Sequence, residues 1–175
     1  MVRRLEPRLH ADASILRFHG LDVMSSHWLH DEGGGVLTPG AFKFVLGLEL
    51  KRAERSQDFL TLVTIEADWE WKGMLVPGDQ ATVREVAEVI GPEVRSTDLI
   101  GRTDERTLGL MLFGANVEQS VPIIHRFVSR IENYAFTNAV RIVVGAACCP
   151  TDTVDADTLT CRALMRSTVS CRGGA

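Results

Sequence analysis

Two apolar runs separated by a short charged segment constrain the fold of this chain more than any other feature. They are DLIG (residues 98–101) and TLGLMLFG (residues 107–114), and RTDER lies between them. Apolar runs of strand length that flank a short polar segment are typical of a β-hairpin. The chain is therefore expected to contain an antiparallel strand pair with mixed charges at its turn.

The segments around this hairpin alternate between helical and strand patterns. Helical spacing of apolar residues predicts helices over residues 38–55, 80–94, 117–133 and 155–171. Apolar, β-branched runs predict strands over residues 59–67 and 139–148. Residues 68–79 are predicted to be a loop. The order α-β-α-β-β-α-β-α gives an α/β (α+β) fold, in which a central, mostly antiparallel sheet of about five strands is flanked by helices.

The composition narrows the class of protein. A chain of 175 residues that is 45% hydrophobic and 24% charged fits one soluble domain with its own core. A net charge of -4 gives no electrostatic reason to bind DNA, RNA or an anionic membrane. No apolar run approaches the roughly 20 residues that span a bilayer, and no signal peptide is recognisable. We expect a cytoplasmic protein without nucleic-acid binding or membrane insertion.

Residues 1–35 differ from the rest of the chain. They show weak periodicity and end in GGG, so we predict an N-terminal arm with a Gly-rich joint, followed by a domain over residues 36–175. His27 and His30 fit one helical face, but no third ligand is nearby, and we expect solvated histidines. The 4 cysteines form no CxxC pair, so we expect small buried residues and no zinc site or disulfide framework.

Several segments, in this order, resemble the GGDEF domain, the fold of diguanylate cyclases. The resemblance covers about residues 36–175. The segments that carry it are LTPGAFKFVLGLELKRA, TLVTIEAD, GDQATVREVAEVI, VRSTDLIGRTDERTLGLML, RIVVGAACCP and DADTLTCRALMRSTVSCRGG. It implies a GGDEF, or nucleotidyl-cyclase-like, domain, although a fold does not by itself decide a function.

The hairpin departs from the family where the family's chemistry takes place. In GGDEF domains two glycines at the tip let the backbone approach a GTP phosphate, and an acid binds magnesium. The degenerate signature of this chain is Asp104, Glu105, Arg106, Thr107 and Leu108. Both glycines are missing, and Arg106 places a cation where magnesium needs an oxygen ligand. The departures imply a lost cyclase activity: we expect no enzyme, no catalytic residue, and no metal or other cofactor.

Neighbouring segments depart from the family as well. Glu66 stands for the first metal-binding acid, and Lys72 fits the family's lysine only with a slip of one residue. The segments LTPGAF and DWEWKGMLVPGD are shorter than their counterparts and lack the residues that read guanine. The acidic pair of the tip suggests a metal or acid–base pair. With Arg102 and Arg106 beside it, we favour a solvated, self-neutralised turn.

An RxxD pattern precedes the tip at the family's spacing, as Arg95 and Asp98. The resemblance assigns such a pair to an inhibitory site that binds cyclic di-GMP. It places a further arginine on the next helix, where Arg126 falls, with Arg130 one turn on. Arginine pairs with guanine N7 and O6 or with phosphate, and a carboxylate accepts the guanine N1–H. The alternative is a surface ion pair. The sequence leaves open whether the Gly-Pro pair that interrupts helix 80–94 displaces the turn that carries Arg95.

Three functions remain open from the sequence. The favoured one is a catalytically inactive GGDEF-like receptor for cyclic di-GMP that signals to a partner protein. The resemblance implies a stacked ligand dimer that bridges two copies of the protein, as a homodimer, or two faces of one copy. The second is a scaffold of the same fold that binds only protein, through residues 1–35. The third is a nucleotide-using enzyme built on Glu66 and Lys72.

Overall fold

The structure is a computed structural model that describes residues 35–173, apart from the side chains of residues 167–170. The arm predicted over residues 1–35, with His27 and His30, lies outside the described residues except for Gly35. The helices are α1 (Pro39–Ser56), α2 (Gln80–Ile90), the 3-10 turn η2 (Gly91–Glu93), α3 (Val117–Glu132) and α4 (Ala156–Met165). The strands are β1 (Leu60–Trp71), β2 (Met74–Pro77), β3 (Leu99–Arg102), β4 (Thr107–Phe113), β5 (Val140–Cys149) and β6 (Ser167–Gly173).

The strands form one 6-stranded sheet in the order β3-β4-β1-β5-β6, and β2 pairs with the end of β1. Every pair of these strands is antiparallel. The central strand β1 lies between β4 and β5, and Glu66 near its middle pairs with Thr107 and Val143. The predicted α+β fold with a mostly antiparallel sheet is confirmed. Within residues 35–173, no helix is both long enough and apolar enough to cross a membrane.

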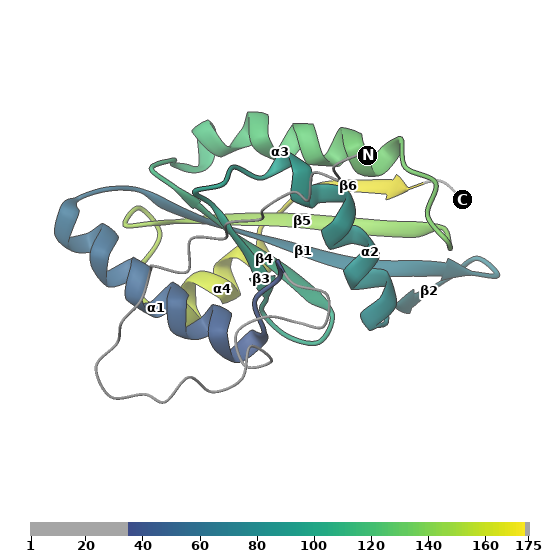
Figure 1. Cartoon of the computed structure of the whole chain (residues 1–175), viewed down its shortest axis with the longest axis horizontal. Helices are drawn as coiled ribbons and strands as arrows, with labels where there is room; N and C mark the ends of the chain where they lie inside the picture. The colour runs from purple at the N-terminus through teal and green to yellow at the C-terminus, as the bar shows by residue number, and fades with distance from the viewer. Residues whose placement is uncertain (1–34, 174–175) are drawn as a thin grey trace, which may run out of the picture.

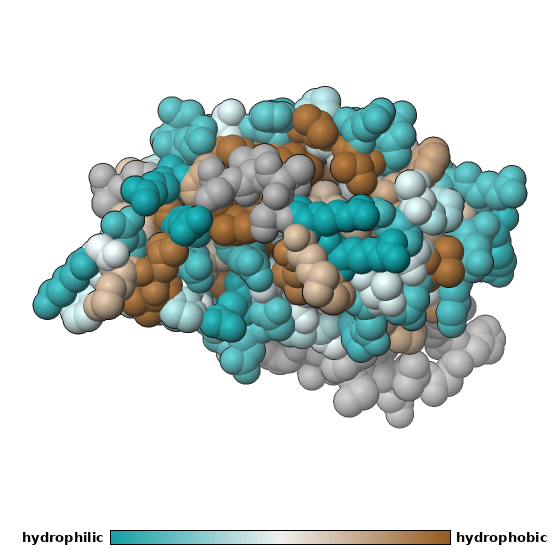
Figure 2. All heavy atoms as spheres, turned by 180° about the vertical axis from the view of Figure 1, so that it is seen from behind, coloured by the Kyte–Doolittle hydropathy of each residue, from teal (hydrophilic) through white to brown (hydrophobic). Residues whose placement is uncertain are grey.

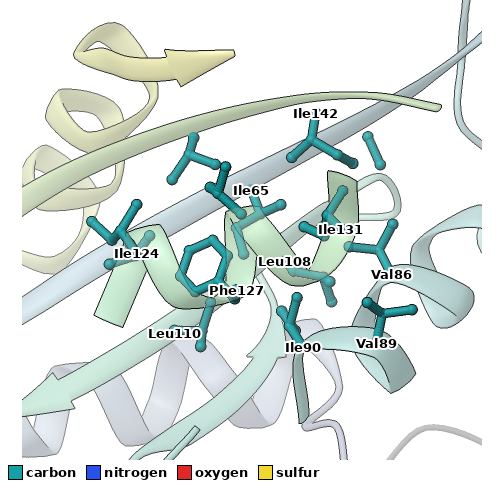
Figure 3. Close-up of a cluster of buried hydrophobic side chains, with 14 of the residues drawn as sticks. Ile65, Val86, Val89, Ile90, Leu108, Leu110, Ile124, Phe127, Ile131 and Ile142 are labelled. Carbon is teal, nitrogen blue, oxygen red and sulfur yellow. The ribbon is translucent and has the colours of Figure 1, made fainter. Parts of the chain in front are cut away.

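Each face of the sheet carries its own hydrophobic core. Figure 3 shows Ile124, Phe127 and Ile131 of α3 pointing toward strand residues such as Ile65 and Leu110, with α2 beside them. On the other face, α1 and α4 pack against β1, β4 and β5. Figure 1 shows α1 and α3 on opposite sides of the long strands. Because helices cover both faces, the central strands are buried along most of their length.

Helix α1 begins where the sequence predicts and holds the hairpin in place. The Thr38 hydroxyl accepts a first-turn N–H (3.3 Å), and Pro39 is the first helical residue. The buried ring of Phe42 lies over Gly101 and Gly109, which face each other across β3 and β4. A Cβ on either glycine would come within 2.4 or 2.5 Å of this ring. The two glycines therefore let α1 approach the hairpin closely.

The prediction of a loop over residues 68–79 is wrong. β1 continues to Trp71, and the chain returns as β2, so that a two-stranded ribbon projects from one end of the sheet (Figure 1). Lys72 and Gly73 form its turn with φ values of 49° and 78°. Positive φ at both central residues is the type I′ pattern, which matches the twist of the strands. The alternation in DWEW, with Trp69 and Trp71 on one face, is the signal for this strand.

The ribbon exposes large apolar side chains. Trp71, Met74 and Leu75 are all exposed. In Figure 2 the ribbon forms the left end of the molecule, where brown and pale spheres stand beside teal ones. The apolar residues are therefore mixed with polar ones there.

The prediction of a helix over residues 155–171 is correct only as far as Met165. Residues 167–173 instead form β6, in which Cys171 pairs with Ile142 of β5. The open edge of β5 offers backbone hydrogen bonds, and the β-branched residues of STVSC suit a strand. Pairing with β5 therefore outweighs the helical spacing of this segment.

Smaller predictions have mixed outcomes. The Gly-Pro pair does interrupt the helix predicted over 80–94, since α2 ends at Ile90 and η2 follows. On α3, Val121 is 40% exposed and Ile123 is buried. Of the cysteines, all of which were expected to be buried, Cys161 is exposed.

Candidate functional site

The tip of the β3–β4 hairpin is closed by its own side chains. Asp104 Oδ1 accepts hydrogen bonds from the backbone N–H groups of Arg106 (2.8 Å) and Thr107 (2.9 Å). The buried Arg102 guanidinium donates to the carbonyl oxygens of Asp104 (3.3 Å) and Glu105 (2.9 Å). The signature residues divide between the exposed turn (Asp104, Glu105, Arg106) and the buried start of β4 (Thr107, Leu108).

These contacts determine which groups of the tip are available to bind a ligand or a metal. The carboxylate of Asp104 is engaged by backbone donors, and the side chain of Arg106 is exposed beside it. Arg102 and Asp104 thus both bind the backbone of the turn. Among the described residues, no group of three His, Cys, Asp or Glu side chains is placed to hold a metal ion.

The structure does not bring Glu66 and Lys72 together. Glu66 is exposed on β1 opposite Thr107, next to the tip. Lys72 lies at the turn of the ribbon, with its Nζ 4.6 Å from the ring centre of Trp71. At roughly 3.3 Å per residue of strand, the two positions are about 20 Å apart. They therefore cannot act on the same phosphate.

The RxxD segment forms a tight turn between η2 and β3. The Asp98 N–H donates to the carbonyl of Arg95 (3.0 Å), and this bond closes the turn. Arg95 is exposed, and its side chain makes no hydrogen bond or ion pair with any described residue. The ion pair between Arg95 and Asp98 that the sequence suggested as an alternative is therefore not formed.

Asp98 is placed differently from the expectation. Its side chain is buried, and its Oδ1 accepts the backbone N–H of Phe113 at the end of β4 (3.2 Å). Its Oδ2 is also buried and has no hydrogen-bond partner among the described residues. Asp98 thus ties the turn to the hairpin, and the orphaned oxygen is a polar group that a donor would stabilise.

Arg126 contacts the residue at the end of η2, just before this turn. It is on the exposed side of α3, and its Nε lies 3.3 Å from Oε2 of Glu93. Its Nη2 also donates to the carbonyl oxygen of Glu93. Glu93 is two residues before Arg95, so the Arg126 guanidinium lies close to the start of the RxxD segment. Arg130 is exposed one turn further along α3, without a contact to another described side chain.

A cleft of about 550 Å³ opens on the other side of the turn, toward the C-terminal end of α1. Its polar lining is Glu49, Arg52, Ser56, Asp58 and Thr97. The one arginine faces two carboxylates and lies 3.5 Å from one of them, Glu49. The cleft has the size of a small-molecule site, but this balance of charge does not favour an anionic ligand.

The fold that these elements define is the GGDEF-like fold. The GGDEF domain of DgcB from Caulobacter crescentus, solved in complex with c-di-GMP, superposes with a TM-score of 0.65 at 16% identity, over 83% of this chain and 88% of that one. The GGDEF domain of FimX from Pseudomonas aeruginosa gives 0.64 at 16% identity, over 78% and 90% of the two chains.

A further similar structure is the diguanylate cyclase SiaD in complex with its activator SiaC, from Pseudomonas aeruginosa. It superposes with a TM-score of 0.62 at 17% identity, over 78% of this chain and 56% of that one. No family model matches the sequence, and no curated protein matches it. The similarity therefore establishes the fold alone.

Sequence reasoning missed one residue of the site. Glu93 lies outside the RxxD pattern, and nothing in its local sequence marks it as a partner of Arg126. The contact joins residues 33 positions apart in the chain, so only the packing of α3 against η2 reveals it.

Proposed function

We propose that this protein is a non-catalytic receptor for cyclic di-GMP that passes the signal to a partner protein. The observation that carries the proposal is the contact between Arg126 and Glu93, because it places the arginine of α3 at the turn that carries Arg95. An exposed arginine on the turn and a second one on the helix beside it suit an anionic ligand with guanine edges. The orphaned Oδ2 of Asp98 would gain a partner if a ligand N–H reached it, and Arg130 extends the positive surface.

Two similar structures favour this ligand and this mode of action. The DgcB domain was solved with c-di-GMP, and SiaD was solved with a protein activator. A receptor of the same fold would bind the nucleotide as a stacked dimer, between two copies of the chain or between two faces of one. The partner protein is defined here only as the protein that receives the signal.

The proposal includes the absence of cyclase activity. Side chains fill the tip where the family has glycines, and Arg106 stands in place of the metal-binding acid. Magnesium requires oxygen ligands and phosphoryl transfer requires the metal, whereas the Asp104 carboxylate is already bound to backbone N–H groups.

Calorimetric titration of the purified protein with cyclic di-GMP tests the receptor function. We expect binding that Arg95→Ala weakens by about 1–3 kcal/mol, roughly ten- to a hundredfold, since a bidentate guanine contact is lost. Arg126→Ala is expected to weaken binding by a similar amount, about 1.5–3 kcal/mol for a charge-assisted hydrogen bond.

The matched control is Arg55→Ala on α1, because Arg55 is exposed and contacts only its own helix. It removes the same charge and is expected to leave the affinity unchanged. If the wild type binds but Arg95→Ala binds equally well, the ligand lies elsewhere. If the wild type does not bind at ligand concentrations well above cellular levels, the receptor proposal fails and a protein-binding scaffold of the same fold takes its place.

A further inference from the structure

The guanidinium of Arg126 is already occupied by a negative group of the protein itself. Its Nε faces the Glu93 carboxylate at 3.3 Å, and its Nη2 donates to the Glu93 carbonyl. A guanidinium offers its donors as a planar fork. Two donor nitrogens of this fork, Nε and Nη2, therefore both bind Glu93.

The position of Glu93 follows from the Gly-Pro pair that ends α2. Pro92 has no N–H to continue the helix, so the chain tightens into η2, and the Val94 N–H donates to the carbonyl of Gly91 (3.2 Å). This turn ends at Glu93. The carbonyl and the carboxylate of Glu93 both contact Arg126 on α3. The Glu93 side chain is 26% exposed and that of Arg126 is 51% exposed. The pair is thus held by backbone geometry but remains open to solvent.

We propose that Glu93 is an internal competitor of the ligand at Arg126 and sets the affinity of the site. The inference rests on the proposed receptor function. The carboxylate occupies the Nε donor that a ligand phosphate or a guanine edge would use, and it also repels a phosphate. Binding at Arg126 is therefore an exchange in which the Glu93 side chain moves into solvent as the ligand arrives. Arg95, which has no such internal partner among the described residues, is the group that the ligand meets first.

The test compares the cyclic di-GMP affinity of the wild type with that of Glu93→Gln by calorimetry. Glutamine keeps the size of the side chain and the backbone carbonyl contact but removes the charge. A partly exposed ion pair contributes up to about 1 kcal/mol. We therefore expect Glu93→Gln to bind about two- to fivefold more tightly, and Glu93→Ala to show a gain in the same direction.

A double-mutant cycle with Arg126→Ala identifies the cause of the gain. If Glu93 acts through Arg126, Glu93→Gln has no effect once Arg126 is alanine. Glu132→Gln is the matched control, since Glu132 is an exposed carboxylate on the same helix. Its substitution changes the net charge equally and is expected to leave the affinity unchanged.

The outcomes separate this inference from the receptor function. Equal or weaker binding by Glu93→Gln, while the wild type binds, overturns the competitor role and leaves the receptor function intact. A gain that persists in the Arg126→Ala background, or that Glu132→Gln reproduces, also overturns it, because the effect is then one of general charge. If neither the wild type nor Glu93→Gln binds, both proposals fail. Binding by Glu93→Gln alone supports the block of Arg126 by Glu93 but overturns the receptor function of the wild type.

Discussion

At the scale of single residues, the charges of the hairpin tip are structural. Arg102 is buried and donates to two carbonyl oxygens of the turn, and Asp104 accepts two of its N–H groups. Charge-assisted bonds of this kind fix a turn that has no glycine to adopt unusual backbone angles. These side chains therefore close the end of the hairpin.

A substitution of Asp104 measures this role. We expect Asp104→Ala to lower the free energy of unfolding by about 1 kcal/mol, because two backbone N–H groups lose their acceptor at an exposed turn. Asp104→Asn keeps an acceptor oxygen and is expected to lose less. Urea unfolding followed by circular dichroism gives the values.

The control at the tip is Glu105→Ala. The carbonyl of Glu105 takes part in the turn, but its carboxylate has no partner among the described residues. This variant loses the same charge and is expected to unfold like the wild type. Equal destabilisation by the two alanine variants would show that net charge, and not the turn, is what Asp104 contributes.

At the scale of secondary-structure elements, the position of α4 depends on how closely this helix can approach strand β5. Gly145 is in the middle of β5, and a Cβ there would lie 1.9 Å from the carbonyl oxygen of Ala163 on α4. Backbone atoms cannot move aside as the end of a flexible side chain can. Helix α4 can therefore pack this closely on the sheet only because residue 145 is a glycine.

We expect Gly145→Ala to destabilise the protein by at least about 2 kcal/mol, since overpacking against backbone forces the helix away from the sheet. Thermal and urea unfolding measure the loss. Gly47→Ala on α1 is the matched control, because no atom lies within 4 Å of its added Cβ. Alanine is the better helix former, so Gly47→Ala is expected to stabilise by about 0.5–1 kcal/mol. If Gly145→Ala unfolds like the wild type, the packing of α4 is looser than described.

The ribbon extends the sheet at the end of β1. DWEWKGMLVPGD replaces a longer family segment, and β1 runs on to Trp71 with Lys72 at the turn. The positions that the resemblance related to guanine reading thus lie in a projecting pair of strands. Lys72 stacks on an aromatic ring at the far end of this pair.

At the scale of the whole molecule, the sheet and helices form the GGDEF-like fold, whereas Glu66 and Lys72, the residues of the enzyme hypothesis, lie far apart along β1 and its turn. We predict that the protein forms no cyclic di-GMP from GTP and magnesium, since Arg106 repels the metal and the Asp104 carboxylate is engaged by backbone N–H groups. Mass spectrometry of the incubated mixture makes the measurement. Product that appears with the wild type and disappears with Glu66→Ala would contradict the prediction and restore the enzyme hypothesis.

The sequence by itself determined the elements whose signals are local. Thr38 and Pro39 fixed the start of α1, the Gly-Pro pair fixed the end of α2, and the two apolar runs fixed the β3–β4 hairpin. Capping, proline geometry and hydrophobic periodicity act within a few residues, so they can be read without knowing the rest of the chain. The exposure of Arg126 was predictable for the same reason, from the spacing of apolar residues on α3.

Only the tertiary structure decided the features that depend on a distant neighbour. Residues 167–173 became a strand because the edge of β5 was open, although their spacing favoured a helix. Asp98 turned inward because the N–H of Phe113 lay within reach, and Arg126 met Glu93 because α3 packs beside η2. Such contacts join segments far apart in the chain, and their free energy depends on the packing that brings the segments together. The local sequence pattern of a segment therefore cannot predict such contacts.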